Sequence, residues 1–224
     1  MLFRSKGIVK REVIRVITPG TIIEEQLLKE KRNNYLAAIA ENGAAFGLAY
    51  VDLSTGEFKT TELPKSQPQL LTAELTRIGP AELYLSESWK KEPQWEKLIE
   101  TTVTYGPEND FEFDNAYRCL TEHFKIQNLH GFGCEELPAA IKASGALLNY
   151  LITTQKHALL HLRRITSYQT GEFMTLDSAT RRNLELTRTI RSGEVNGSLL
   201  GVLDLTVTSM GARLLRSWVE KPLT

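Results

Sequence analysis

Residues 35–63 constrain the fold of this chain more than any other stretch. They contain three runs rich in apolar, aromatic and β-branched residues, at 35–41, 44–53 and 57–63. Asn42-Gly43 separates the first two runs, and this dipeptide is the strongest short hairpin signal because both residues tolerate a positive φ. Ser54-Thr55-Gly56 separates the second run from the third. The stretch therefore predicts an antiparallel meander of three strands.

After residue 63 the pattern changes to alternating helices and strands. Ser66 and Gln69 have the spacing of a capping box, and Pro68 fits the first turn of a helix. Short strands are predicted at 82–86 and 101–105, and a largely buried helix from Pro138 to about Thr154. This order predicts an α/β fold with a mixed five-stranded sheet, and it is the order of ribonuclease-H-like folds.

One predicted helix has two clearly different faces. Asp114 fits its N-cap, because a carboxylate there accepts hydrogen bonds from free backbone N–H groups. The apolar face consists of Phe113, Tyr117, Leu120 and Phe124. If that face is buried, the outward-facing residues are Asn115, Arg118, Cys119 and Glu122.

From residue 177 onward the sequence predicts only helices. Asp177 or Ser178 fits the N-cap of a helix that runs to the glycine-rich stretch at 193–197. Ser198 fits the cap of a second, short helix, and a third is predicted to begin at Ser209 and to end before Pro222. A helical tail of about 50 residues has little interior of its own. We therefore expect its apolar stripes to seek partners, including a second copy of the chain.

The composition is that of an ordinary globular protein. Lys and Arg total 27, as do Asp and Glu, and 42% of the 224 residues are hydrophobic. No apolar run approaches the roughly 18 residues of a membrane span, and the N-terminus lacks the apolar region of a secretory signal. Cys119 and Cys134 belong to no CxxC pair, so we expect reduced thiols in a cytoplasmic protein without a zinc site.

Asp52 is the most plausible catalytic residue. Metal-dependent nucleases of the ribonuclease-H type place an acid near this point, but two-metal hydrolysis needs several converging carboxylates. The first predicted strand offers only Glu41, beside its turn. An Asx turn in Asp-Leu-Ser-Thr-Gly accounts for Asp52 equally well and is the preferred interpretation. The four histidines are scattered and suggest no catalytic set.

Basic residues offer a second alternative, a module that binds nucleic acid without sequence preference. Residues 1–20 carry Arg4, Lys6, Lys10, Arg11 and Arg15 against Glu12 alone. Four further arginines, at 181, 182, 188 and 191, are interleaved with Glu185 and Glu194, which favours an ordinary solvated face. The sequence contains no P-loop motif GxxxxGK[ST].

Several stretches of the chain resemble the MutS family of bacterial DNA mismatch-recognition proteins. They are VKREVIRVITPGT, RNNYLAAI, AYVDLSTGEF, HGFG, LDSATRRNLELT and GSLLGVLDLTVTSMGARLLRSWVEKPL. The resemblance implies three parts. Residues 1–20 would end a mismatch-reading domain, residues 21–165 would form a ribonuclease-H-like connector domain, and residues 166–224 would begin an incomplete all-α core or lever domain.

The resemblance also implies a function. The connector of this family relays between mismatch reading and the ATPase and offers a surface to the partner MutL. The family's Phe-x-Glu mismatch wedge and its Walker motif are both absent from this sequence. We therefore expect a non-catalytic fragment without a cofactor of its own, whereas ATP, Mg²⁺ and mismatched duplex DNA would bind the longer parent. Asn115, Arg118, Cys119 and Glu122 are the predicted contacts to MutL.

Overall fold

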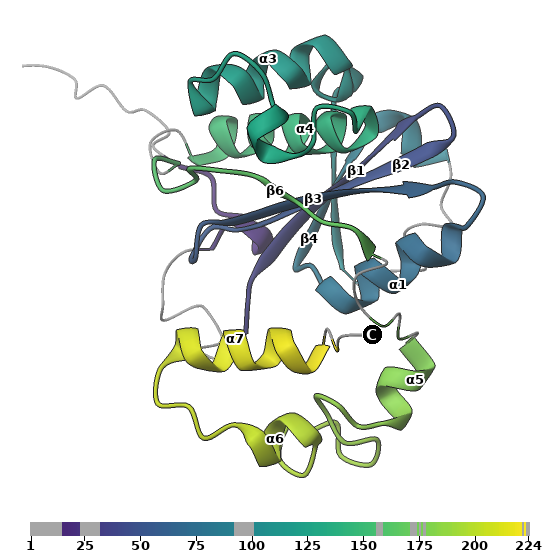
Figure 1. Cartoon of the computed structure of the whole chain (residues 1–224), viewed down its shortest axis with the longest axis vertical. Coiled ribbons are helices and arrows are strands. Elements are labelled where there is room, and N and C mark those ends of the chain that lie inside the picture. The colour runs from purple at the N-terminus through teal and green to yellow at the C-terminus, as the bar shows by residue number, and fades with distance from the viewer. Residues whose placement is uncertain are drawn as a thin grey trace, which may run out of the picture.

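The computed structural model describes residues 15–22, 32–91, 101–155, 159–170, 174, 176, 178–220 and 222. An α/β domain and a helical tail follow one another along the chain (Figure 1). The domain contains the strands β1 Tyr35–Asn42, β2 Ala45–Asp52, β3 Glu57–Pro64, β4 Glu82–Ser86, β5 Thr102–Gly106 and β6 Thr166–Ser167. Its α-helices are α1 Pro68–Ile78, α3 Phe113–Phe124 and α4 Pro138–Gln155. Short 3₁₀ helices are η1 Pro19–Thr21, η2 Glu87–Lys91, η3 Glu108–Phe111 and η4 His130–Phe132. The tail contains α5 Ser178–Asn183, α6 Leu199–Leu203 and α7 Ser209–Glu220.

The strands form one mixed sheet in the order β5-β4-β1-β2-β3-β6. β1, β2 and β3 are the predicted antiparallel meander, whereas β4 lies parallel to β1 and β5 parallel to β4. The first turn works as expected, because Gly43 adopts a φ of 54°. Asn42, however, is the last residue of β1, and the turn consists of Gly43 and Ala44.

Helices cover both faces of the sheet. In Figure 1, α3 and α4 lie on one side and α1 on the other, with the helical tail beyond α1. Alternate residues of β1 serve the two interiors: Leu36 and Ala38 belong to the core under α4, and Ala37 and Ile39 to the core over α1. Because both faces are covered, β1 is apolar throughout its buried part rather than alternating.

Two glycines allow the helical layer of α3 and α4 to pack closely on the sheet. A Cβ at Gly47 of β2 would lie 1.9 Å from the carbonyl oxygen of Ala139, at the start of α4. A Cβ at Gly145 of α4 would lie 2.3 Å from both Cα and Cβ of Ala116 in α3. Backbones can approach this closely only where no side chain intervenes. The contact at Gly47 sets how closely α4 lies on the sheet, and the contact at Gly145 sets how closely α3 lies on α4.

A buried carboxylate fixes the segment that precedes the sheet. Glu82 of β4 is 0% exposed and accepts hydrogen bonds from Gly20 N at 2.9 Å and Thr18 Oγ1 at 2.5 Å. It also accepts bonds from Thr104 Oγ1 and Tyr150 Oη, each at 2.7 Å. Four donors satisfy a charge that would be costly to bury without them. Local sequence patterns do not single out Glu82, because its partners come from three distant segments.

The tail exposes much apolar surface. The exposed fractions of its side chains reach 99% at Val207, 90% at Leu205, 69% at Met210 and 65% at Trp218. The expected apolar stripe of α7 is thus confirmed, and it has no cover within the described residues. Self-association through this surface stays a prediction.

Several expectations about the elements were wrong. The sheet has a sixth strand, β6, beyond the five predicted, because Thr166 and Ser167 pair with Lys59 and Thr60. Gln67 rather than Ser66 is the N-cap of α1, and its side chain makes no capping bond. Glu112, not Asp114, is the N-cap of α3.

Two apolar residues that were expected to be buried are exposed. Phe113 of α3 is 37% exposed, whereas Leu120 on the same stripe is fully buried. Phe113 is the first residue of α3. Ile152 of α4 is 40% exposed, because it borders the groove described below.

The first helix of the tail is much shorter than expected. It ends at Asn183, and Glu185 adopts a φ of 48°. The chain then turns back, so that Leu199 N and Leu200 N donate to the carbonyl oxygens of Glu185 and Leu186. These tertiary hydrogen bonds replace the helical ones expected up to residue 193. The Ser198 cap and the start of α7 at Ser209 are confirmed.

Some expectations concern residues outside the described part of the chain. They are residues 8–14 of a strand that β-branched residues predict at 8–17, residues 24–31 of a short helix predicted at 24–32, the basic residues before Arg15, the capping residue Asp177 and His157. Residues 15–17, which belonged to the same expected strand, have no strand pairing in the structure.

The glycine contact between α3 and α4 leads to a first prediction. Gly145→Ala should lower the free energy of unfolding by about 1–3 kcal/mol, because the clash with Ala116 outweighs the helix propensity gained. Urea denaturation measures this. Gly131→Ala is the matched control, since no atom lies within 4 Å of its Cβ position. Equal stability of both variants would show that α3 does not need this close approach.

Candidate partner-docking groove

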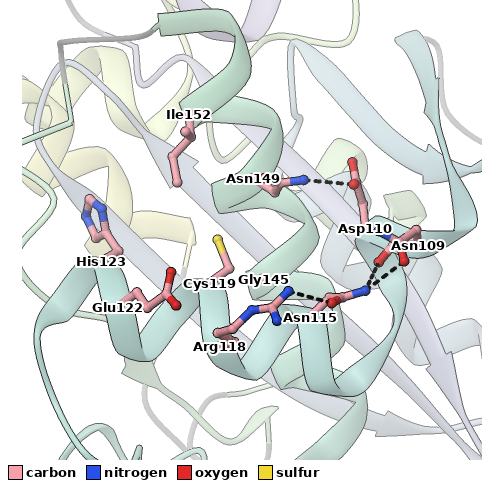
Figure 2. Close-up of a pocket in the computed structure, with 10 residues that line it drawn as sticks. All are labelled: Asn109, Asp110, Asn115, Arg118, Cys119, Glu122, His123, Gly145, Asn149 and Ile152. Carbon is pink, nitrogen blue, oxygen red and sulfur yellow. Dashed lines mark hydrogen bonds between the residues drawn. The ribbon is translucent and has the colours of Figure 1, made fainter.

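An open groove of about 570 Å³ lies between η3, α3 and α4. Figure 2 shows the side chains that surround it, with α3 on one side and α4 on the other. Its lining consists of Asn109, Asp110, Asn115, Arg118, Cys119, Glu122, His123, Gly145, Asn149 and Ile152. Most of these side chains are polar, so the groove suits a partner that offers hydrogen bonds and charges.

The α3 wall of the groove is held by hydrogen bonds. Arg118 Nη2 donates to Asn115 Oδ1 at 2.9 Å. Asn115 Nδ2 in turn donates to Asn109 Oδ1 at 2.8 Å and to the Asn109 carbonyl oxygen at 3.1 Å (Figure 2). These linked hydrogen bonds fix the rim of the groove before any partner binds. Arg118 and Glu122 are exposed, so both charges are available to a partner.

The opposite wall contains a fixed carboxylate. Asp110 accepts hydrogen bonds from Tyr84 Oη at 2.6 Å and from Asn149 Nδ2 at 2.8 Å. Burial and the bond to Asp110 raise the pKa of Tyr84, which therefore remains a neutral donor. The groove thus carries a guanidinium on α3 and a carboxylate from η3 on the other side.

Cys119 lies in the groove without being reactive. Burial, followed by repulsion from Glu122 and Asp110, raises the pKa of its thiol to about 11. A thiol with that pKa is protonated at neutral pH, and only the thiolate is a good nucleophile. Cys119 therefore contributes a weakly polar surface to the groove rather than covalent chemistry.

The structure brings all four predicted contact residues into this groove: Asn115, Arg118, Cys119 and Glu122. Whether they contact a partner stays a prediction. Local patterns in the sequence did not reveal the residues from the other elements, above all Asp110 and Asn149. They lie before α3 and within α4, so helical periodicity alone does not connect them with the face of α3.

Asp52 has a structural role in its turn. Its Oδ1 accepts hydrogen bonds from Ser54 N at 2.8 Å and from Ser54 Oγ at 2.6 Å. Its Oδ2 accepts a bond from Asn34 N at 3.3 Å, and the side chain is fully buried. The preferred Asx-turn interpretation is confirmed.

Glu41 cannot join Asp52 in a two-metal site. The two residues lie at opposite ends of the β1–β2 hairpin, because Tyr35 pairs with Asp52 and Glu41 with Phe46. Glu41 instead pairs with Lys65 at 2.6 Å. Among the described residues, no group of three or more His, Cys, Asp or Glu side chains is placed to hold a metal ion.

The described histidines, His123, His130 and His161, belong to three different segments of the chain. His123 Nε2 lies 3.1 Å from the carbonyl oxygen of Leu162, where it joins α3 to the segment after α4. His130 and His161 are exposed.

None of the described helices is long and apolar enough to cross a membrane.

The fold and the groove define a mixed α/β domain with an open polar surface, followed by a helical segment. Residues 34–163 match the family model of MutS domain II, and residues 179–224 match that of MutS domain III. The chain belongs to the MutS family.

Individual relatives agree with the family models. The chain is 49% identical to the DNA mismatch repair protein MutS of Symbiobacterium thermophilum over 224 residues, 47% to that of Halothermothrix orenii and 48% to that of Alkaliphilus metalliredigens. Each match covers 98% of this chain. The chain spans about a quarter of the length of these curated relatives, 25–26%.

The raised pKa of Cys119 leads to a second prediction. In a Cys134→Ser background, alkylation of Cys119 by iodoacetamide should be slow at pH 7.5 and should accelerate about tenfold per pH unit up to about pH 11. The reaction is followed by mass spectrometry. A Cys119→Ser variant is the control, since Cys134 is only 1% exposed and should react more slowly still. A rate that reaches its plateau near pH 8.5 would contradict the assignment.

Proposed function

We propose that this chain acts in DNA mismatch repair as the connector region of a MutS protein, and that the groove between α3 and α4 binds MutL. Membership of the MutS family supports the first part, because the relatives are named as mismatch repair proteins. The second part rests on one observation: α3, α4 and η3 present a continuous, hydrogen-bonded polar surface.

The chemistry of the groove fits a folded protein partner. Arg118 offers an exposed guanidinium fork, the group best suited to bidentate contact with a carboxylate. Glu122 stands one turn further along α3 and offers the opposite charge. Opposite charges on one rim fix the register of a partner and exclude partners with the reverse pattern. Because the rim is already ordered, binding costs little conformational entropy.

A relay from this groove to other parts of the protein needs a mechanical connection. The α/β domain and the tail are joined by a bond from Arg213 Nη1 in α7 to Ser54 Oγ at 2.8 Å. Ser54 is in turn bonded to Asp52 at the end of β2. A shift of the domain would therefore reach α7 through the sheet. Transmission to an ATPase, with ATP and Mg²⁺ bound there, and binding of mismatched DNA belong to the longer parent in this proposal.

The same proposal includes the domain architecture. Residues 21–165 form the connector with a ribonuclease-H-like fold, and residues 166–224 begin the core or lever domain. The order of the elements supports this, because three meandering strands precede the alternating helices and strands. The connector has a non-catalytic role, and the hydrogen bonds of Asp52 support that assignment over a nuclease.

A charge reversal in the groove tests the binding proposal. Arg118→Glu should weaken binding of MutL from the same organism about 10–100-fold, because it loses a favourable charge and adds a repulsive one. Biolayer interferometry with the immobilised chain measures the dissociation constant, and circular dichroism verifies that the variant is folded.

The matched control reverses an arginine elsewhere on the domain. Arg164 is exposed and lies in the segment before β6, away from the lining of the groove. Arg164→Glu changes the net charge equally and should leave affinity within about twofold. An unchanged affinity in Arg118→Glu, or an equal loss in both variants, would refute the groove as the binding site.

A further inference from the structure

Arginines gather where the α/β domain meets the helical tail. Five of them form this group, which we call the arginine junction: Arg32, Arg77, Arg181, Arg213 and Arg216. They come from the segment before β1, from α1, from α5 and from α7. Four of the five, all but Arg181, line one small cavity together with Asn33, Tyr35, Ser217 and Glu220.

Carboxylates balance only part of this charge. Arg77 pairs with Glu74 at 2.5 Å, and Arg216 pairs with Glu220 at 2.9 Å. Arg181 donates to the backbone oxygens of Leu176 and Glu220 instead of to a carboxylate. Within the described part of the chain, no ion pair joins Arg32 or Arg213 to an acid. The junction therefore has more guanidinium groups than carboxylates.

One guanidinium is left with a donor to spare. Arg213 Nη1 donates to Ser54 Oγ, but Arg213 Nε is buried and has no hydrogen-bond partner. A buried donor without a partner in the protein is costly, and a water or an ion can satisfy such a group. Arg213 lies on α7, so any group that satisfies it also holds the tail.

The arginines also repel one another. Burial, followed by the charges of Arg216 and Arg188, lowers the pKa of Arg32. Burial also lowers the pKa of Arg181; Glu220 opposes this shift, and Arg77 adds to it. Crowded cations of this kind are stabilised by an anion placed between them.

The cavity limits the size of that anion. Its volume is about 30 Å³, which is too little for a nucleoside. The hydroxyl of Tyr35, on the wall of the cavity, donates a hydrogen bond to Glu57. Tyr35 therefore keeps its proton and adds no negative charge to the cavity. Among the described residues of the lining, Glu220 is the one carboxylate, and Arg216 pairs with it at 2.9 Å.

We propose that the cavity of the arginine junction binds a single small oxyanion, inorganic phosphate, which links α7 to the α/β domain. Guanidinium groups match the oxygens of phosphate with paired N–H donors, and Arg213 Nε supplies one that is otherwise unused. Phosphate would cancel the repulsion between Arg32 and Arg216. The site is separate from the groove on α3, and its test does not depend on MutL.

Thermal unfolding in phosphate tests the proposal. At constant pH and ionic strength, replacing sodium chloride by sodium phosphate should raise the Tm by roughly 3–6 °C at ten times the dissociation constant. Hydrogen exchange of the α7 amides should slow under the same conditions. An equal effect of chloride would mean general screening and would overturn the site.

Variants locate the effect. Arg32→Gln removes a crowded charge, so without phosphate its Tm should stay the same or rise, while its response to phosphate disappears. Arg213→Lys keeps the charge but loses Nε, so phosphate binding by calorimetry should weaken about tenfold. Arg163→Gln, an exposed residue outside the junction, is the control and should respond like the unmodified chain. A normal response in Arg32→Gln would refute the proposal.

A nucleotide tests the source of the phosphate group. Because the cavity has no room for a nucleoside, 5′-AMP should bind at least tenfold more weakly than inorganic phosphate. Tighter binding of 5′-AMP would contradict a site for the free anion.

Discussion

The close approach of α3 to α4 at Gly145 is the contact on which the rest of the structure depends. Ala116 lies where the side chain of any other residue at position 145 would be. The approach sets the distance between the two helices, and that distance sets the width of the groove between them. α4 is itself held against the sheet where Ala139 meets Gly47. The position of the surface proposed for MutL relative to the backbone of β2 is therefore set by two contacts that tolerate no added methyl group.

On the opposite side of the sheet, beyond the apolar core over α1, polar contacts hold the tail to the domain. Asp52 accepts a hydrogen bond from Ser54 in the turn after β2, and Ser54 accepts one from Arg213 of α7. These bonds connect α7 to the end of β2. The groove on one side and the arginine junction on the other are thus both connected to β2, one through Gly47 and one through the turn after Asp52. Packing contacts transmit a displacement rigidly, whereas the arginine junction can tighten or loosen with the charge it contains. The two sides of the sheet therefore suit different tasks, recognition on one and coupling on the other.

Local patterns in the sequence predicted much of the α/β domain. The meander followed from Asn42-Gly43 and Ser54-Thr55-Gly56, and α4 followed from its long apolar run after Pro138. Four residues of the groove followed from the amphipathic pattern of α3. What local patterns missed depends on contacts between distant segments. Asp110 and Asn149 join the groove only through the fold, Glu82 accepts bonds from three separate segments, and the loop after Asn183 is set by hydrogen bonds to α6. β6 is two residues long and exists only because β3 lies beside it.

NMR mapping of the complex tests the central claim most directly. Backbone amide shifts of the isotope-labelled chain are recorded while unlabelled MutL is added. The account predicts that the largest changes fall on Asn115, Arg118, Glu122 and Asn149, with smaller ones along α3 and α4. Changes confined to α5, α6 and α7, with the groove residues unaffected, would contradict it.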